Sequence, residues 1–177
     1  MTREMLRLSE ELGIAREPGA VLAALAKIRD GHDAESAARG LTWSEFEEFC
    51  AAAVTAAGYA VRRNVKLKSP RRQLDLLADS STMCLSIDCK HWRRGAGWGA
   101  LEKLALAQVE RTRQYANTQS SGDEKVFLPL LLTMTDNLVR IVNGVPVVPV
   151  YALRDFLASV NRFDENLAFI RREAKER

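Results

Sequence analysis

Residues 73–90 read QLDLLADSSTMCLSIDCK, and this stretch decides the fold. Two β-prone runs, residues 73–78 and 83–92, flank the polar segment Asp79-Ser80-Ser81-Thr82, whose side chains favour a turn. We therefore expect the two runs to pair as an antiparallel hairpin. Most of their residues are apolar, so a charged side chain within them needs an oppositely charged partner or a bound cation, because burying an unpaired charge is costly.

Three charged residues lie inside these two runs: Asp75, Asp88 and Lys90. Strand alternation places Asp88 and Lys90 on one face and Cys89 on the other. If the turn is centred on Ser80 and Ser81, Asp75 lies opposite Ser86 and diagonal to Asp88, roughly 7 to 8 Å away. Two converging carboxylates suit Mg²⁺ or Mn²⁺, with the backbone carbonyl of Cys89 and water as further ligands. The alternative is an ordinary Asp–Lys pair on a solvent-exposed face.

The residues before this hairpin predict an amphipathic helix with a well-marked start. Thr42 followed by Glu45 has the spacing of a capping box. Phe46 belongs to the apolar face of the helix, and Gly58 should end it. Glu47 falls at the border of the apolar face, where it could reach a site between helix and sheet; a solvated glutamate is the alternative.

The remaining elements complete an alternation of strands and helices. We expect a strand over 59–67, a helix over 99–117, a buried strand over 126–134, a hairpin of 139–142 and 145–150 around Asn143-Gly144, and a helix over 153–160. This order predicts an α/β sandwich with a central mixed β-sheet flanked by helices. Residues 1–40 are predicted to be a helical N-terminal extension, residues 41–160 the main domain, and residues 161–177 a charged helical tail.

The succession of motifs is similar to a known family. It comprises Trp43-Ser44-Glu45-Phe46-Glu47, Gly58-Tyr59, Leu74-Asp75-Leu76-Leu77 and Ile87-Asp88-Cys89-Lys90. Together they resemble the PD-(D/E)XK nuclease superfamily, and within it the Mrr-like restriction endonucleases and Holliday-junction resolvase-like proteins. The resemblance covers about residues 41–157 and implies the restriction-endonuclease-like sandwich. Two departures are Leu74 in place of proline and Asp88 in place of the commoner glutamate.

The resemblance also implies an activity and the residues that carry it. It makes Asp75 the first metal-binding aspartate, Asp88 the second acidic ligand and Lys90 the catalytic lysine. Glu47 corresponds to a glutamate that often holds a water, and Gln108 resembles a glutamine found near the site in some Mrr-like members. The expected function is a Mg²⁺-dependent (or Mn²⁺-dependent) DNA endonuclease that leaves a 5′-phosphate and a 3′-hydroxyl. The alternative is a catalytically silent nucleic-acid-binding or assembly module.

Positive charge is concentrated around the hairpin. Residues 62–94 hold nine basic and three acidic side chains, whereas residues 1–40 hold six basic and seven acidic ones. Such a stretch suits DNA, although a solvated strand face is the alternative. The residues expected to contact nucleic acid are Arg71, Arg72, Arg93, Arg94 and Trp92, with Trp92 or Trp98 either packing or stacking on a base.

Composition limits the other classes of protein. The chain has 177 residues, of which 47% are hydrophobic and 28% charged, which is enough to bury a core. The sequence predicts no membrane span and no secretory signal, so we expect a cytoplasmic protein. A zinc site of Cys84, Cys89 and His91 is disfavoured because the two cysteines face opposite ways. The apolar stripes at Met5-Leu8-Leu12 and Val21-Leu25-Ile28 must pack on the main domain, on a second copy or on another protein; we expect a partner surface and a homodimer.

Overall fold

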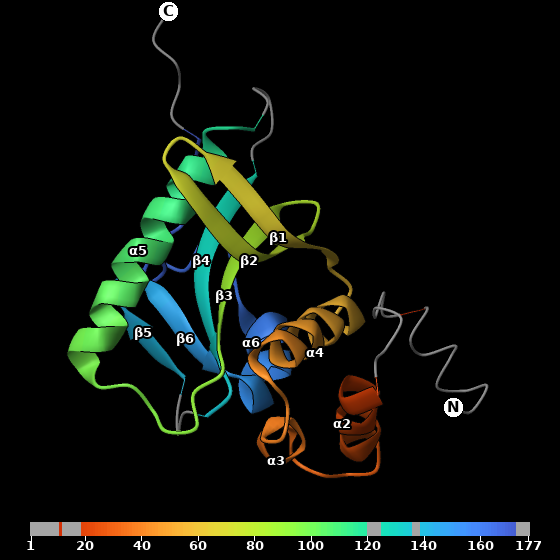
Figure 1. The fold of residues 1–177 in the computed structure, drawn as a ribbon. Coiled ribbons are helices and arrows are strands. Elements are labelled where there is room, and N and C mark those ends of the chain that lie inside the picture. Colours follow the sequence, from red (N-terminus) through yellow and green to blue (C-terminus); the bar gives the residue numbers. More distant parts are fainter. Residues whose placement is uncertain (1–10, 12–18, 120–124, 136–138, 173–177) are drawn as a thin grey trace, which may run out of the picture.

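A computed structural model of the chain describes residue 11 and residues 19–119, 125–135 and 139–172. These residues form three layers (Figure 1). A six-stranded sheet lies between helix α5 (Trp98–Ala116) on one face and α4 (Trp43–Ala56) with α6 (Leu153–Ser159) on the other. The expected α/β sandwich around a mixed sheet is confirmed.

The sheet combines antiparallel and parallel pairs. Its strands are β1 (Ala60–Lys68), β2 (Arg71–Asp79), β3 (Met83–Lys90), β4 (Val126–Thr133), β5 (Arg140–Val142) and β6 (Val145–Pro149), in the spatial order β1-β2-β3-β4-β6-β5. The pairs β1–β2, β2–β3 and β5–β6 are antiparallel, whereas β3–β4 and β4–β6 are parallel. All eight residues of β4 are buried, as expected for a strand covered on both faces.

The start and end of α4 follow its sequence signals. The Thr42 side chain accepts the Glu45 N–H while Glu45 bonds back to Thr42, so the predicted capping box is present. Gly58, with φ of 91°, lies just after the helix in the left-handed conformation that glycine adopts without strain. Phe46 and Phe49 are fully buried against the sheet. This packing fixes the face of α4 that carries Glu47.

The N-terminal residues that the structure describes pack on the main domain. Helix α2 (Gly19–Arg29) places Val21 and Leu22 in the same apolar cluster as α4 and the sheet, and Leu25 and Ile28 lie against it. The stripe at Val21-Leu25-Ile28 is thus covered by the chain itself, so the prediction that it forms a partner surface was wrong. The stripe at Met5-Leu8-Leu12 lies outside the residues that the structure describes. A short helix that the sequence analysis missed, α3 (Ala34–Ala38), begins after Asp33, which caps it by accepting the Ser36 N–H.

The β2–β3 register differs from the expected one by two residues. Asp79 pairs with Cys84 and Leu76 with Ile87, so the turn is centred one residue later than Ser80-Ser81. Ser80 explains the shift, because its N–H and its side chain both bond to the Met83 carbonyl and enclose a four-residue loop. Continuing this register places Asp75 directly opposite Asp88, not diagonal to it.

The β1–β2 hairpin extends beyond the rest of the sheet. Its pairing continues to Lys68–Arg71, whereas the β2–β3 ladder ends at Leu76–Ile87. Leu76 packs on the α4 side, but Leu74, two residues away, joins the cluster on the α5 side with Leu67. In a flat strand Leu74 and Leu76 would share a face, so the strand turns over between them. The far half of the hairpin therefore covers α5.

The segment after α6 is not the helix that we expected. Residues 161–172 form turns, and Ile170 bridges Phe127 on β4. The segment crosses the Asn143-Gly144 turn closely enough that a Cβ on Gly144 would lie 2.7 Å from the Ala168 side chain. Burial of Leu167 and Ile170 against the sheet outweighs the helix-forming composition. Residues 173–177 and the expected loop at 120–123 lie outside the described residues.

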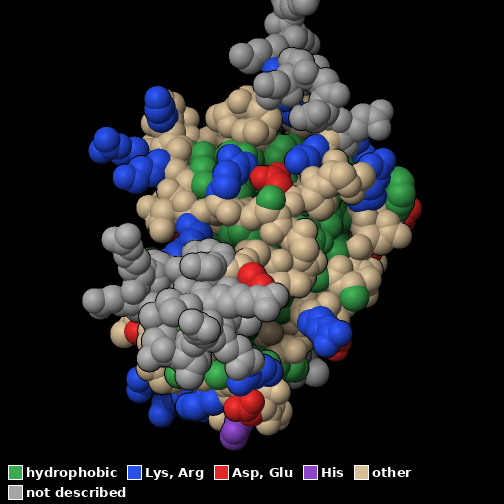
Figure 2. All heavy atoms as spheres, turned by 90° about the vertical axis from the view of Figure 1, so that its right-hand side faces the viewer, with side chains coloured by type: hydrophobic (Ala, Val, Ile, Leu, Met, Phe, Trp, Pro, Cys, Tyr) green, Lys and Arg blue, Asp and Glu red, His purple; other side chains and the backbone are tan. Residues whose placement is uncertain are grey.

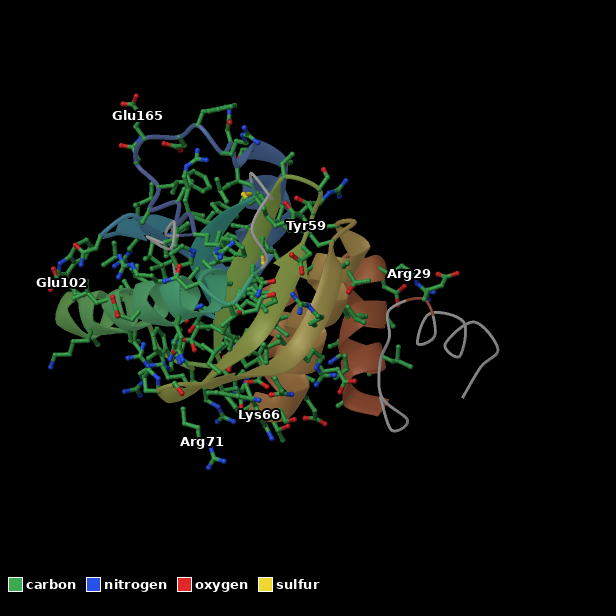
Figure 3. The ribbon with its side chains drawn as sticks, turned by 90° about the horizontal axis from the view of Figure 1, so that it is seen from above. Arg29, Tyr59, Lys66, Arg71, Glu102 and Glu165 are labelled. Carbon is green, nitrogen blue, oxygen red and sulfur yellow. The ribbon has the colours of Figure 1, made fainter. Side chains whose placement is uncertain are left out.

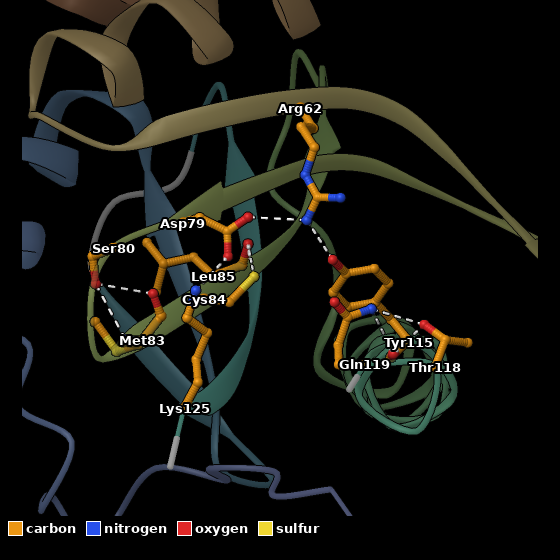
Figure 4. Close-up of polar contacts among 10 residues, drawn as sticks. All are labelled: Arg62, Asp79, Ser80, Met83, Cys84, Leu85, Tyr115, Thr118, Gln119 and Lys125. Atoms are coloured by element: carbon orange, nitrogen blue, oxygen red, sulfur yellow. Dashed lines mark hydrogen bonds and ion pairs between the residues drawn. The ribbon is translucent and has the colours of Figure 1, made fainter. Parts of the chain in front are cut away.

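An ion-pair network ties β2 to β1 and to the start of β4 (Figure 4). Asp79 accepts from Arg62 at 3.0 Å and from Lys125 at 3.2 Å, and Arg62 also bonds to the hydroxyl of Tyr115 on α5. Burial raises the pKa of Asp79, but the bonds from Arg62 and Lys125 outweigh it, so this pKa lies below its usual value. A carboxyl group whose pKa is lower in the folded state than in the unfolded state stabilises the fold at pH values above its unfolded-state pKa. This stabilisation is lost as the pH falls through the folded-state pKa.

Asp79→Asn should therefore destabilise the protein by about 1 kcal/mol at pH 7, because it removes two partly buried ion pairs. Urea unfolding at pH 7 and pH 3.5 measures the effect, which should shrink at the lower pH. Asp30→Asn is the matched control, since its pair with Arg29 is exposed and 3.6 Å long. Equal stability losses in the two variants would contradict a structural role for the network.

Candidate active site

Three secondary-structure elements bring acidic side chains to one place. Glu47 comes from α4, Asp75 from β2 and Asp88 from β3, and Lys90 follows from the same strand. The three carboxylates are buried, with exposed fractions of 4%, 9% and 6% respectively. Their electrostatic influence on one another is direct, because Asp75, Asp88 and Lys90 all affect the pKa of Glu47. The structure therefore brings together four of the five residues expected to be catalytic.

Asp75 is held by the backbone of the neighbouring strand. Its Oδ2 accepts the Cys89 N–H at 2.9 Å, at the point where the regular β2–β3 ladder has ended. Burial raises the pKa of Asp75, the Cys89 bond lowers it, and the nearby Asp88 raises it again, with a net rise. The Asp75 carboxylate thus accepts the hydrogen bond that a backbone carbonyl of the neighbouring strand would otherwise accept. This bond fixes Asp75 beside Asp88.

Asp88 is neutralised by two cations. Its Oδ2 lies 2.7 Å from the Lys90 Nζ, and its Oδ1 lies 3.1 Å from the Arg111 Nη2. The Asp–Lys pair that was considered as the alternative is therefore present, but its carboxylate is buried and does not lie on a solvent-exposed face. Arg111 is a site residue that the sequence analysis missed.

Gln108 contacts the strand and Arg111 instead of the carboxylates. Its Nε2 donates to the Ser86 carbonyl at 2.6 Å, and its Oε1 accepts from the Arg111 Nε at 2.8 Å. Gln108 therefore positions Arg111, which in turn reaches Asp88. The available signal for Arg111 was its spacing, since a residue three positions after Gln108 lies on the same side of the helix.

One carboxylate oxygen of Glu47, Oε1, is buried without a hydrogen-bonding partner among the described residues. Burial raises the pKa of Glu47 to about 7, and the neighbouring Asp75 contributes further to the rise. A polar atom that is buried without a partner is uncommon and indicates a place for a water or an ion. The alternative of a solvated glutamate is excluded by this burial.

The residues present fit a magnesium or manganese ion. The described residues contain no cluster of three or more His, Cys, Asp or Glu side chains arranged to hold a metal. Mg²⁺, however, usually binds through one or two carboxylates and keeps several waters. Asp75 and Asp88 supply such a pair; burial first, and the neighbouring carboxylates second, raise the pKa values of Asp75 and Glu47, and a cation would offset both effects.

The residues expected to contact nucleic acid occupy two separate places. Arg71 and Arg72 lie on the hairpin, whereas Arg93 and Arg94 are exposed in the loop after β3. Trp92 packs in an apolar cluster beneath α5, which favours packing over stacking on a base. Trp98 is 54% exposed and donates to Glu102.

The fold and this cluster define a restriction-endonuclease-like α/β domain. Residues 38–123 match the family model of the Mrr catalytic domain, described as a restriction endonuclease. This segment, from α4 to α5, contains all the residues of the cluster, and the match supports a PD-(D/E)XK, Mrr-like nuclease family. No curated protein and no solved structure gives a significant match. Among the described residues, no helix is long and apolar enough to cross a membrane.

Glu47→Gln should change how stability depends on pH. The folded-state pKa of Glu47, about 7, exceeds the unfolded value of about 4.3, so its ionisation destabilises the fold as the pH rises between these values. Relative to the wild type, the variant should gain about 1 to 2 kcal/mol between pH 4.5 and pH 7.5.

Urea unfolding in EDTA at several pH values provides the measurement. The control is Glu165→Gln, a surface position at the edge of the molecule (Figure 3), which should keep the wild-type pH dependence. Parallel curves for the wild type and Glu47→Gln would show that Glu47 is not buried as described.

Proposed function

We propose that the domain is a Mg²⁺-dependent or Mn²⁺-dependent deoxyribonuclease that hydrolyses phosphodiester bonds of DNA. The observation that carries the proposal is the convergence of Glu47, Asp75, Asp88 and Lys90 on one buried position inside the family-matched segment. A silent binding module would gain nothing from burying three carboxylates together, because their desolvation reduces stability. Nuclease activity therefore explains the buried cluster better than a silent binding role does.

The metal would be held by Asp75, Asp88 and the backbone carbonyl of Cys89. When bound, it would stabilise the negative charge that develops on the phosphate during hydrolysis. Because Lys90 and Arg111 both lie against the Asp88 carboxylate, a metal that binds Asp88 would require one of them to move. Arg111 keeps its bond to Gln108 through Nε, which leaves its Nη atoms free to turn toward a phosphate.

The side chains of the cluster provide the remaining chemistry. A water that donates to the Glu47 Oε1 and lies near the Lys90 Nζ is positioned to attack phosphorus in line with the departing oxygen. The new bond joins the water oxygen to phosphorus and the bond to the 3′ oxygen breaks. The water would lose one proton to the Glu47 carboxylate while the Lys90 ammonium holds it in place, and the departing 3′ oxygen would take up a proton from solvent water. The products are a 5′-phosphate and a 3′-hydroxyl.

Lys90→Ala should reduce cleavage by roughly 100-fold or more while DNA affinity stays nearly unchanged, because water activation affects the rate and one phosphate contact contributes little to binding. Supercoiled, linear and branched DNA are incubated with Mg²⁺ or Mn²⁺, and products are followed on gels. Asp88→Ala should also be inactive, and the exposed Lys27→Ala serves as the control.

Wild-type cleavage rates in Lys90→Ala would remove this residue from the mechanism. A wild-type protein that binds these DNAs but cuts none of them, with either metal, would favour the silent binding module.

We also infer a homodimer, since a nuclease that cuts both strands of a duplex benefits from two sites. Light scattering of the full chain should then give twice the monomer mass. Because α2 packs on α4, a chain that starts at Leu41 should unfold more readily, so the full chain is the form to test. A monomer at all concentrations would contradict the inference.

A further inference from the structure

The far half of the β1–β2 hairpin carries positive charge that the described chain does not neutralise. Residues 64–73 contain no acidic residue and four basic ones: Lys66, Lys68, Arg71 and Arg72. Among the described residues, none of these four makes an ion pair, although nearby Arg62, Arg63 and Lys125 each pair with an acid. Lys66 and Arg71 point away from the body of the molecule (Figure 3). In Figure 2, lysine and arginine side chains outnumber acidic ones on the upper part of the molecule, at the height of the hairpin in Figure 1.

Two neighbouring hollows, which share Arg72 and Gln73, lie between these cations and Arg111. One hollow lies between β2 and α5 and is lined by Arg72, Gln73, Leu106, Ala107, Glu110 and Arg111. A second hollow, around the hairpin, is also lined by Arg72 and Gln73 and continues to Lys66, Lys68 and Arg71. Glu110 is the acidic residue of the path, and Arg113 neutralises it. We call this surface the hairpin path; Arg111, at one end, contacts Asp88.

We propose that the hairpin path holds the phosphate backbone of duplex DNA next to the bond that is cut. The inference rests on the proposed function and adds the route and the strandedness of the substrate. Unpaired lysines and arginines bind phosphates, and they contribute most of the sequence-independent affinity of DNA-binding proteins. From Asp75 to Arg71 the strand covers about 14 Å at roughly 3.4 Å per residue, which is enough for several phosphates.

The lining of the path favours a duplex over a single strand. Grooves for single-stranded DNA combine basic residues with aromatic side chains on which bases stack. None of the residues that line the two hollows is aromatic. The hairpin path therefore offers contacts to phosphates and none of the stacking surfaces that unpaired bases require.

Binding of a fluorescent DNA duplex in EDTA tests the path without any cleavage. The variant K68Q/R71Q removes two exposed cations from the hairpin, and the control K27Q/R154Q removes two exposed cations from α2 and α6, far from it. A plot of log K against log salt should lose about 0.9 in slope for each phosphate contact removed, close to 1.8 for K68Q/R71Q. The control should keep the wild-type slope, and a single strand of the same sequence should bind more weakly than the duplex.

The outcomes separate this inference from the proposed function. A slope for K68Q/R71Q that equals the slopes of the wild type and the control would overturn the path, even if the wild type cuts DNA. A reduced slope with a wild type that never cuts would support the path and reject the nuclease. Tighter binding of the single strand, with the same loss in the variant, would overturn the choice of a duplex. R72Q, nearer to the cluster, should raise KM for duplex cleavage more than it lowers kcat.

Discussion

The Cys89 N–H group, in the middle of the sheet, donates its hydrogen bond to the carboxylate of Asp75 and not to the backbone of a neighbouring strand. A buried backbone donor must find a partner, so the side chain of Asp75 allows β2 to separate from β3 without an unsatisfied group. Beyond this point β2 pairs with β1 alone, and the far half of the hairpin turns over α5. The cluster lies where the strands separate, and the hairpin path begins there. Without this one bond, neither the opening nor the position of Asp75 would be defined.

Of the three carboxylates in the cluster, only Asp88 is paired with cations among the described residues. The negative charge left on the other two suits the binding of a cation or a reacting group. Lys90 and Arg111 neutralise Asp88, whereas burial raises the pKa values of Asp75 and Glu47, which form no ion pair within the part of the chain that the structure describes. Such an arrangement lowers stability relative to an apolar core. Perturbed carboxylates of this kind are found mainly at functional sites, where a ligand or reacting group supplies the missing charge.

Positive charge in the molecule divides into two kinds. Arg62, Arg63 and Lys125 pair with acids and hold elements together, as the network of Figure 4 shows for Asp79. The cations at the end of the hairpin have no such partners among the described residues. The net charge of +3 conceals this difference, because it sums structural and available cations. Nucleic-acid binding depends on the second kind.

Local sequence signals determined most of the elements and the residue types of the cluster. The Thr42–Glu45 capping box, the Asn143-Gly144 turn and the alternation around Asp88 are short-range patterns, and each led to the observed structure. Tertiary structure alone decided what depends on packing between distant residues. The β2–β3 register follows from the hydrogen bonds of Ser80. Arg111 contacts Asp88 because α5 packs across the sheet. Residues 161–172 do not form the expected helix because Leu167 and Ile170 are buried. Periodicity describes one element at a time, whereas these contacts depend on how the elements are placed relative to one another.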